Sequence, residues 1–260
     1  MNRELLEIAE DGWSRLPPGP ATEVLDDRRF HLRHMTFPAV QGGSAQRVRL
    51  DGDVASAIAA VRAWFAGHGR ERFLWTVGPS TTPRDLERLL VAAGAEPWKD
   101  EPVWTGMVMT TPPPAVPGIE VRKVTRLEEA HAAVDVAAAA AGSSAEEVSA
   151  AHAHVDERWA KRDPKRAAEF LGRIDGAAVA SATSWYGDGA VYLSGSGTIP
   201  AARGRGAYRA LVRARWEDAV ARGTPALVVQ AGSMSRPILE RVGFDSVCEV
   251  HALVDRSAPP

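Results

Sequence analysis

The sequence predicts an α/β protein of the α+β kind, in which a mixed sheet is covered by helices. Strand-like segments gather in the middle of the second half, and helix-like segments precede and follow them, which is typical of this class. The length of 260 residues and the hydrophobic content of 45% suffice for one large domain or two small ones. We therefore expect a globular protein with ordinary hydrophobic cores.

A proline-rich segment separates the two halves. The stretch TTPPPAVPG, residues 110–118, holds four prolines. Proline removes backbone donors and fixes φ, so no helix or central strand is expected to cross this segment. We predict an N-terminal domain over residues 1–112 and a C-terminal domain over residues 118–260.

The first half alternates helix and strand patterns. Residues 53–69 carry apolar side chains at helical spacing and end in glycine, as an amphipathic helix does. The apolar run RFLWTVG, residues 72–78, is typical of a short strand. Residues 82–96 predict a second helix, because Pro83 lies in its first turn and Gly94 at its end.

The second half contains more strand patterns. The predicted strands cover residues 118–124, 167–174, 177–186, 190–200, 225–231 and 244–255. The predicted helices cover residues 126–142, 144–162, 206–223 and 235–243. Residues 74–96 and 228–246 share the order strand, Gly, Ser, Pro, Leu-Glu-Arg, Gly, so the two halves are expected to share one layout.

One short segment concentrates positive charge. The stretch TIPAARGRGAYRALVRAR, residues 198–215, holds two glycines and five arginines at the junction of a predicted strand and a predicted helix. The first amides of a helix have no internal partners and lie at the positive end of its dipole, so this junction can hold a phosphate. A Walker loop is excluded because no Gly-Lys-Ser or Gly-Lys-Thr occurs here, and a dinucleotide fingerprint would need glycine at Arg209. A solvated, arginine-rich helix after a glycine turn is the alternative.

Two motifs resemble one known family. The segment IPAARGRGAYRAL is similar to the acetyl-CoA signature of the GCN5-related N-acetyltransferase (GNAT) family, and SMSRPILERVGF is similar to its late helix. The resemblance covers residues 119–255. The first 110 residues resemble the degenerate partner half of tandem members. The resemblance implies a GNAT fold with two GNAT-like halves and an acyl-CoA-dependent N-acyltransferase.

The resemblance also implies a cosubstrate site for acetyl-CoA. Family members hold the pantetheine arm along the splayed end of the fourth strand and the pyrophosphate on the amides of the following turn. The corresponding residues are Ser196, Gly197, Thr198 and Ile199 for the arm, and Arg203, Gly204, Arg205, Gly206, Ala207 and Tyr208 for the phosphates. No metal is expected.

The chain departs from the family pattern at the catalytic positions. Tyr192 stands where a glutamate base is common, Leu239 replaces the tyrosine that protonates the leaving thiolate, and Gly232 replaces an asparagine. A tyrosine of pKa near 10 is a weak base, so positioning of the amine beside the activated thioester would supply much of the acceleration. Tyr192 and Ser235 are the candidate catalytic residues. The alternatives are a non-catalytic acyl-CoA binding or sensing module and a transferase for a longer acyl group.

The acceptor is expected to be the primary amine of a small molecule. Glu146 and Glu147 open a predicted helix where family members line the acceptor pocket, and Tyr186 belongs to the same region. These three residues are the candidate substrate-binding groups.

Charge and cysteine content limit the partners. The formal net charge of −2 argues against a nucleic-acid binder. The single cysteine, Cys248, permits no internal disulfide, and neither a secretory signal nor a membrane segment is expected from the sequence. We expect a cytoplasmic protein with no membrane partner, and the sequence leaves monomer and homodimer open.

Overall fold

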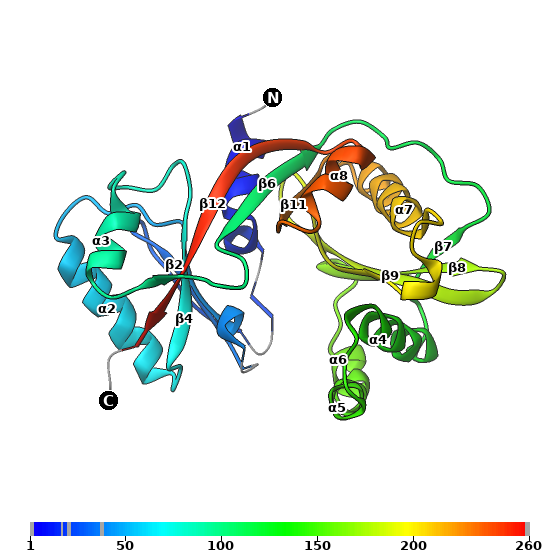
Figure 1. Cartoon of the computed structure of the whole chain (residues 1–260), viewed down its shortest axis with the longest axis horizontal. Coiled ribbons are helices and arrows are strands. Elements are labelled where there is room, and N and C mark those ends of the chain that lie inside the picture. The colour runs from blue at the N-terminus through cyan, green and yellow to red at the C-terminus, as the bar shows by residue number, and fades with distance from the viewer. Residues whose placement is uncertain (1–2, 17, 20–21, 37–38, 258–260) are drawn as a thin grey trace. The chain divides into compact units, whose positions relative to one another are not determined.

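The computed structural model describes residues 3–16, 18–19, 22–36 and 39–257. They fall into two compact units (Figure 1). The first unit combines residues up to 107 with residues 230–241 and those from 245 on, and the second combines residues 108–229 with 242–244. The C-terminal strand therefore belongs to the compact unit that the first half builds. The division at residues 112 and 118 stays a prediction about the two ancestral halves.

The elements follow one another closely along the chain. The first half forms α1 (Arg3–Asp11), β1 (Thr22–Asp26), β2 (His31–Met35), β3 (Gly43–Gln46), α2 (Val54–Gly67), β4 (Arg72–Val77), α3 (Leu86–Ala92), β5 (Glu96–Pro97) and β6 (Val103–Met109), with short 3₁₀ turns at Gly12–Arg15 and Val40–Gly42. The second half forms β7 (Glu120–Lys123), α4 (Leu127–Ala141), α5 (Ala145–Ala153), α6 (Val155–Ala160), β8 (Ala167–Ile174), β9 (Ala177–Tyr186), β10 (Val191–Thr198), a 3₁₀ turn (Pro200–Ala202), α7 (Ala207–Ala221), β11 (Leu227–Ala231), α8 (Arg236–Val242) and β12 (Asp245–Arg256).

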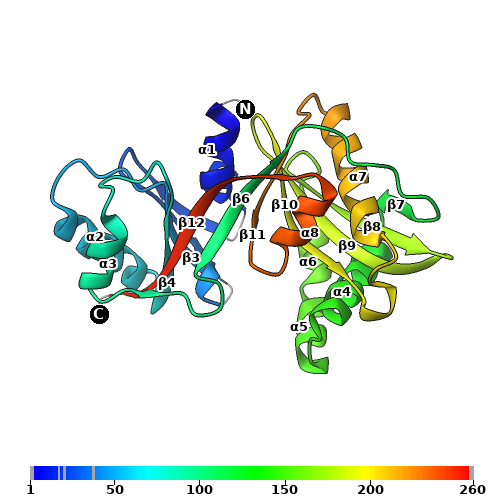
Figure 2. The same cartoon turned by 45° about the horizontal axis from the view of Figure 1, so that its top comes forward.

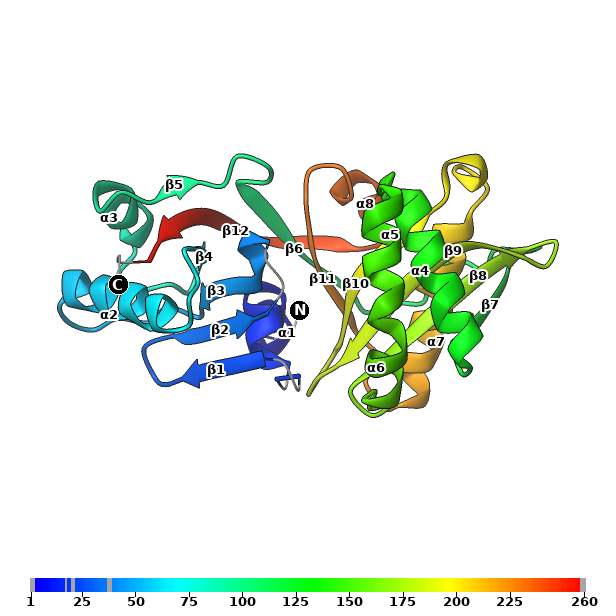
Figure 3. The ribbon, with the colours of Figure 1, turned by 90° about the horizontal axis from the view of Figure 1, so that it is seen from below.

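In the first unit the strand order is β1-β2-β3-β4-β12-β6. Figure 3 shows β1, β2 and β3 side by side, and Figure 2 shows β12 next to β6. Strand β12 pairs antiparallel with β4 in the register Leu253↔Trp75. Asp255 fixes this strand because it accepts from the indole Nε1 of Trp75 at 2.9 Å and from the Arg62 guanidinium at 2.9 Å. A buried charge paired in this way holds the end of the chain in the first sheet.

In the second unit the strand order is β11-β10-β9-β8-β7. The pairs β7–β8, β8–β9 and β9–β10 are antiparallel, and β10–β11 is parallel. Helix α7 covers one face of this sheet, and α4 covers the other (Figure 1). Leu211 of α7 packs on Phe170 of β8 in a fully buried cluster.

Most predicted elements are found close to their predicted positions. The predicted helix over residues 144–162 is divided at His154 into α5 and α6. Residues 22–46 and 103–109, for which no element was predicted, form β1, β2, β3 and β6. The hydrophobic pattern did not indicate strand β2, because its buried positions include the polar residues His31 and Arg33.

Within the described ranges, no helix has the length and apolar character needed to cross a bilayer.

Candidate functional site

Strand β10 has an irregular, partly unpaired end. Its parallel register with β11 covers only Val191↔Leu227 and Tyr192↔Val228, whereas β10 continues to Thr198. Its register with β9 also shifts between Ser194 and Gly197, and Gly195 has a φ of +55°. Such a bulge re-aims the backbone and leaves amides and carbonyls of β10 for another partner.

The turn after β10 leads into the N-terminus of α7, where the first backbone amides have no acceptor within the helix. Gly204 and Gly206 have φ values of +78° and +91°, and Gly206 is the N-cap of α7. The amides of the first helical turn, from Ala207 on, have no partner within the helix. A Cβ on Gly206 would lie 2.9 Å from Val116 Cγ1, so glycine is required both by conformation and by space.

The arginines of this turn differ in their roles. Arg203 donates to the carbonyls of Thr198 at 3.3 Å and Ala140 at 2.9 Å, which ties the turn to α4. Arg205 lies in the turn, not on the helix, and faces Asp175 at 4.0 Å. Arg209 is exposed on the first turn of α7. The turn is therefore positively charged, and Arg203 fixes it to the end of β10 and to α4.

Arg215 is a fully buried cation beneath the bulge. Its Nε donates to the carbonyl of Leu211 at 3.2 Å, and its Nη1 donates to Ser196 Oγ at 3.1 Å. Its side chain also bonds Tyr208, and burial lowers the pKa of the guanidinium from 12.5 to about 10. Burial raises the pKa of the Tyr208 hydroxyl. Among the described residues Nη2 has no hydrogen-bond partner. Sequence analysis missed Arg215, because a third-turn helix arginine normally faces solvent.

A cavity of about 410 Å³ lies on the opposite face of the same sheet. Its walls include the alanines of α4, its mouth includes Glu147 of α5, and its floor includes Ser181 and Thr183 of β9 and Gly195 of β10. A Cβ on Gly195 would lie 3.5 Å from Thr183 Oγ1. The cavity therefore reaches the bulge of β10 from the α4 side.

Solved structures of known proteins share this architecture. No family model matches the sequence, and no curated protein matches it. A GCN5-related N-acetyltransferase from Kribbella flavida has a TM-score of 0.72 at 19% sequence identity, over 96% of this chain and 95% of that chain. A tandem GNAT protein from the clavulanic acid biosynthesis pathway has a TM-score of 0.65 at 17% identity, over 100% of this chain and 89% of that chain.

The chain has a GNAT fold. A GCN5-related N-acetyltransferase from Sphaerobacter thermophilus gives a third match, with a TM-score of 0.61 at 16% identity over 90% of this chain and 83% of that chain. The GNAT fold predicted from the sequence, including the tandem arrangement, is confirmed. The bulged strand, the glycine turn and helix α7 follow one another in the GNAT order that the sequence motif predicts.

The two residues predicted to be catalytic, Tyr192 and Ser235, have different surroundings from each other. Tyr192 is buried on β10, opposite Trp185 of β9. Ser235 Oγ donates to the carbonyl of Gly232 at 3.2 Å, just before α8. This bond closes the local turn and differs from a helix-capping contact, in which the serine oxygen accepts from a backbone amide of the first helical turn. Leu239 is buried on α8. The catalytic roles of Tyr192 and Ser235 stay predictions.

The predicted substrate-binding residues separate into two groups. Glu147 lines the cavity, where it caps α5 by accepting from the backbone amide of Ser144 at 2.7 Å, and this bond lowers its pKa. Its neighbour Glu146 is exposed and is not among the cavity-lining residues described. Tyr186 donates to Asp218 of α7 at 2.6 Å, on the face away from α4, and burial and this bond raise its pKa.

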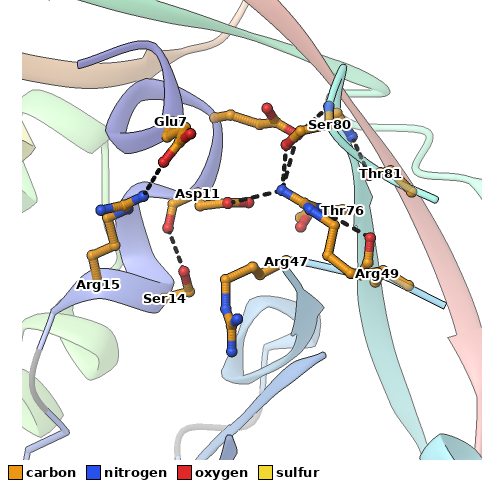
Figure 4. Close-up of polar contacts among 12 residues, drawn as sticks. Glu7, Asp11, Ser14, Arg15, Arg47, Arg49, Thr76, Ser80 and Thr81 are labelled. Carbon is orange, nitrogen blue, oxygen red and sulfur yellow. Dashed lines mark hydrogen bonds and ion pairs between the residues drawn. The ribbon is translucent and has the colours of Figure 1, made fainter. Parts of the chain in front are cut away.

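The first unit has a buried polar cluster of its own (Figure 4). Arg49 donates to Asp11 at 3.2 Å and also bonds Ser80. Glu10 accepts from the backbone amide of Ser80 at 2.9 Å. Burial, together with the charge of Glu10, raises the pKa of Asp11 to about 6. Across the described part of the chain, no three His, Cys, Asp or Glu side chains are placed to hold a metal ion.

Proposed function

We propose that the C-terminal half transfers an acetyl group from acetyl-CoA to the primary amine of a small molecule. The observation that carries this proposal is the end of the β10–β11 register at Tyr192↔Val228, while β10 runs on through a bulge to Thr198. The end of β10, which no longer pairs with β11 on that side, offers donors and acceptors to the amides of a pantetheine arm. The glycine turn and the start of α7 then offer amides to the diphosphate.

The reaction would take place at the bulge. The amine nitrogen attacks the thioester carbon, a C–N bond forms, and the C–S bond breaks. The nitrogen loses one proton to become an amide, and the sulfur leaves as a thiolate that takes up a proton to become the free thiol. Backbone amides of the bulge, around Gly195 and Ser196, would stabilise the oxyanion of the tetrahedral intermediate. Arg215 would act as a positioning residue, because it holds Ser196 and places a positive charge beneath the bulge.

Proton transfer would depend on the substrate more than on a protein base. Tyr192 is buried, and a phenol has an ordinary pKa near 10. Glu147, with its lowered pKa, is too acidic to be an efficient base near neutral pH. The fraction of amine that is neutral would therefore set the rate, and alignment in the cavity would supply the acceleration.

Release of free thiol from acetyl-CoA tests the proposal. The purified chain is incubated with acetyl-CoA and a panel of primary amines, and CoA binding is measured separately by calorimetry. Steady thiol release with an amine supports the transferase. Tight CoA binding without turnover across the panel would identify the non-catalytic sensor, and turnover restricted to longer acyl-CoA substrates would change the donor. Absence of CoA binding would refute the site itself.

A further inference from the structure

The cavity on the α4 face combines apolar walls with one unsatisfied hydroxyl. Ala133, Ala137 and Ala141 of α4 contribute methyl groups to its wall. Ser181 lies on its floor, is only 4% exposed, and its Oγ has no hydrogen-bond partner among the described residues. Leaving a buried hydroxyl without a partner is unfavourable. The cavity therefore suits a ligand with an apolar body and a polar group that reaches Ser181.

The charges around the cavity disfavour an anionic ligand. Arg158 and Glu169 both line the cavity and form an ion pair at 3.6 Å, so their opposite charges compensate each other. Glu147 is the remaining carboxylate, and the amide that lowers its pKa is a neutral partner. A carboxylate on the ligand would meet this unmatched negative charge, whereas an amine arriving as its ammonium form would be attracted.

The cavity also connects the ligand to the bulge of β10. Glu169, Thr183 and Ser194 occupy one line of cross-strand partners over β8, β9 and β10. Gly195, which follows Ser194, opens the floor at the end of this line, and Ser181 lies two residues before Thr183 on the same face of β9. An amine nitrogen at Gly195 can therefore belong to a molecule whose body lies over Ser181.

We propose that the acceptor is an apolar amine without a carboxylate, of a size that fits about 410 Å³, which forms a hydrogen bond with Ser181. Simple aryl-alkyl and alkyl amines belong to this class, and free amino acids do not. The inference rests on the proposed function for the position of the amine nitrogen. The preference for a ligand without a negative charge rests on the residues that line the cavity.

Matched ligand pairs test the class. Tyramine is compared with tyrosine, and butylamine with norvaline, because each pair differs only by the carboxylate. We expect a preference for the amine of about tenfold or more, both in kcat/KM for thiol release and in affinity for the CoA-loaded protein measured by calorimetry. Equal use and equal affinity within both pairs would overturn the proposal.

Matched variants test the residues. Glu147→Gln should weaken the preference against the amino acids, and the glutamine can still cap α5. Glu128→Gln, an exposed residue of α4 outside the cavity lining, should leave the preference unchanged. Ser181→Ala should lower the affinity for tyramine several-fold. Ser184→Ala should not, because Ser184 is also buried, and its Oγ likewise has no hydrogen-bond partner among the described residues, but it points to the other face of β9. Identical behaviour of the two serine variants would overturn the role of Ser181.

The two measurements separate this inference from the proposed function. Amine preference in calorimetry without any thiol release would leave the binding class standing and refute acetyl transfer. Thiol release that is equally fast for amine and amino acid would support the transfer and refute the class.

Discussion

Replacement of Arg215 by methionine should have a small effect on the stability of the protein and a large effect on its turnover. Arg215 is fully buried, and its pKa is lowered from 12.5 to about 10 by burial. This shift corresponds to an unfavourable contribution of roughly 3 kcal/mol for the charged form at neutral pH. The contribution would disappear as the pH rises from about 10 toward 12.5, because a lowered pKa in the folded state makes the protein more stable once the group is neutral.

The hydrogen bonds of Arg215 oppose this cost. Bonds to Ser196 and Leu211 contribute about 1 kcal/mol each, and the bond to Tyr208 is already included in the lowered pKa. The two terms nearly cancel, and no carboxylate would be left unpaired in the variant. We therefore expect Arg215→Met to change the free energy of unfolding by no more than about 1 kcal/mol, or about 2–4 °C in Tm.

Turnover should respond much more strongly. The Arg215 guanidinium bonds Ser196 of the bulge at 3.1 Å, so an oxyanion formed there would be stabilised by roughly 2 kcal/mol, about half the energy of a direct 4 Å ion contact at an effective dielectric constant of 20. We expect kcat for thiol release to fall about 30-fold, with little change in CoA affinity, and Arg215→Lys to restore part of it. Wild-type kcat in a folded Arg215→Met variant would refute the role of this cation.

Further predictions concern the glycine turn, the far side of the sheet and the first unit. Gly206→Val should raise the Kd for CoA at least about tenfold. Gly223→Val, at the other end of α7, has a similar positive φ of +77° but open space around it, so it should cost backbone strain alone, on the order of 1–3 kcal/mol, without affecting CoA. Tyr186→Phe should lose about 1–2 kcal/mol of stability, because Asp218 loses a donor, and should keep the KM for the amine; a raised KM would support the predicted substrate role of Tyr186. Asp11 has a raised pKa of about 6, so wild-type stability should fall by roughly 3 kcal/mol as the pH rises from about 4 to above 6. Asp11→Asn should remove this slope in denaturant unfolding measured across the pH range, and an unchanged slope would contradict the shift.

The sequence predicted the parts of the site that depend on local backbone chemistry. Gly204 and Gly206 indicated the junction of a strand and a helix, and the structure has both at positive φ immediately before α7. A strand was predicted over residues 190–200, and β10 covers Val191–Thr198. These signals lie within a few residues of one another, so no distant contact was needed to find them.

Tertiary structure decided the features that join distant segments. Arg215 is buried because α7 lies flat on the sheet below the bulge, and nothing in its neighbouring residues distinguishes it from a solvent-facing arginine. Glu101 accepts from Ser233 at 3.1 Å, 132 residues further along the chain, beside the position where the family pattern has an asparagine. Ser181 is a candidate ligand-binding residue because it lines the cavity and its Oγ has no hydrogen-bond partner among the described residues, and neither property can be read from the sequence.

The sequence by itself therefore determined the fold class, the glycine turn and the start of α7, because these follow from the conformational preferences of neighbouring residues. The tertiary structure alone placed β12 in the first sheet, buried Arg215 and shaped the cavity between α4 and the sheet. Burial and the pairing of charges depend on which surfaces meet, and that information is spread over residues far apart in the chain.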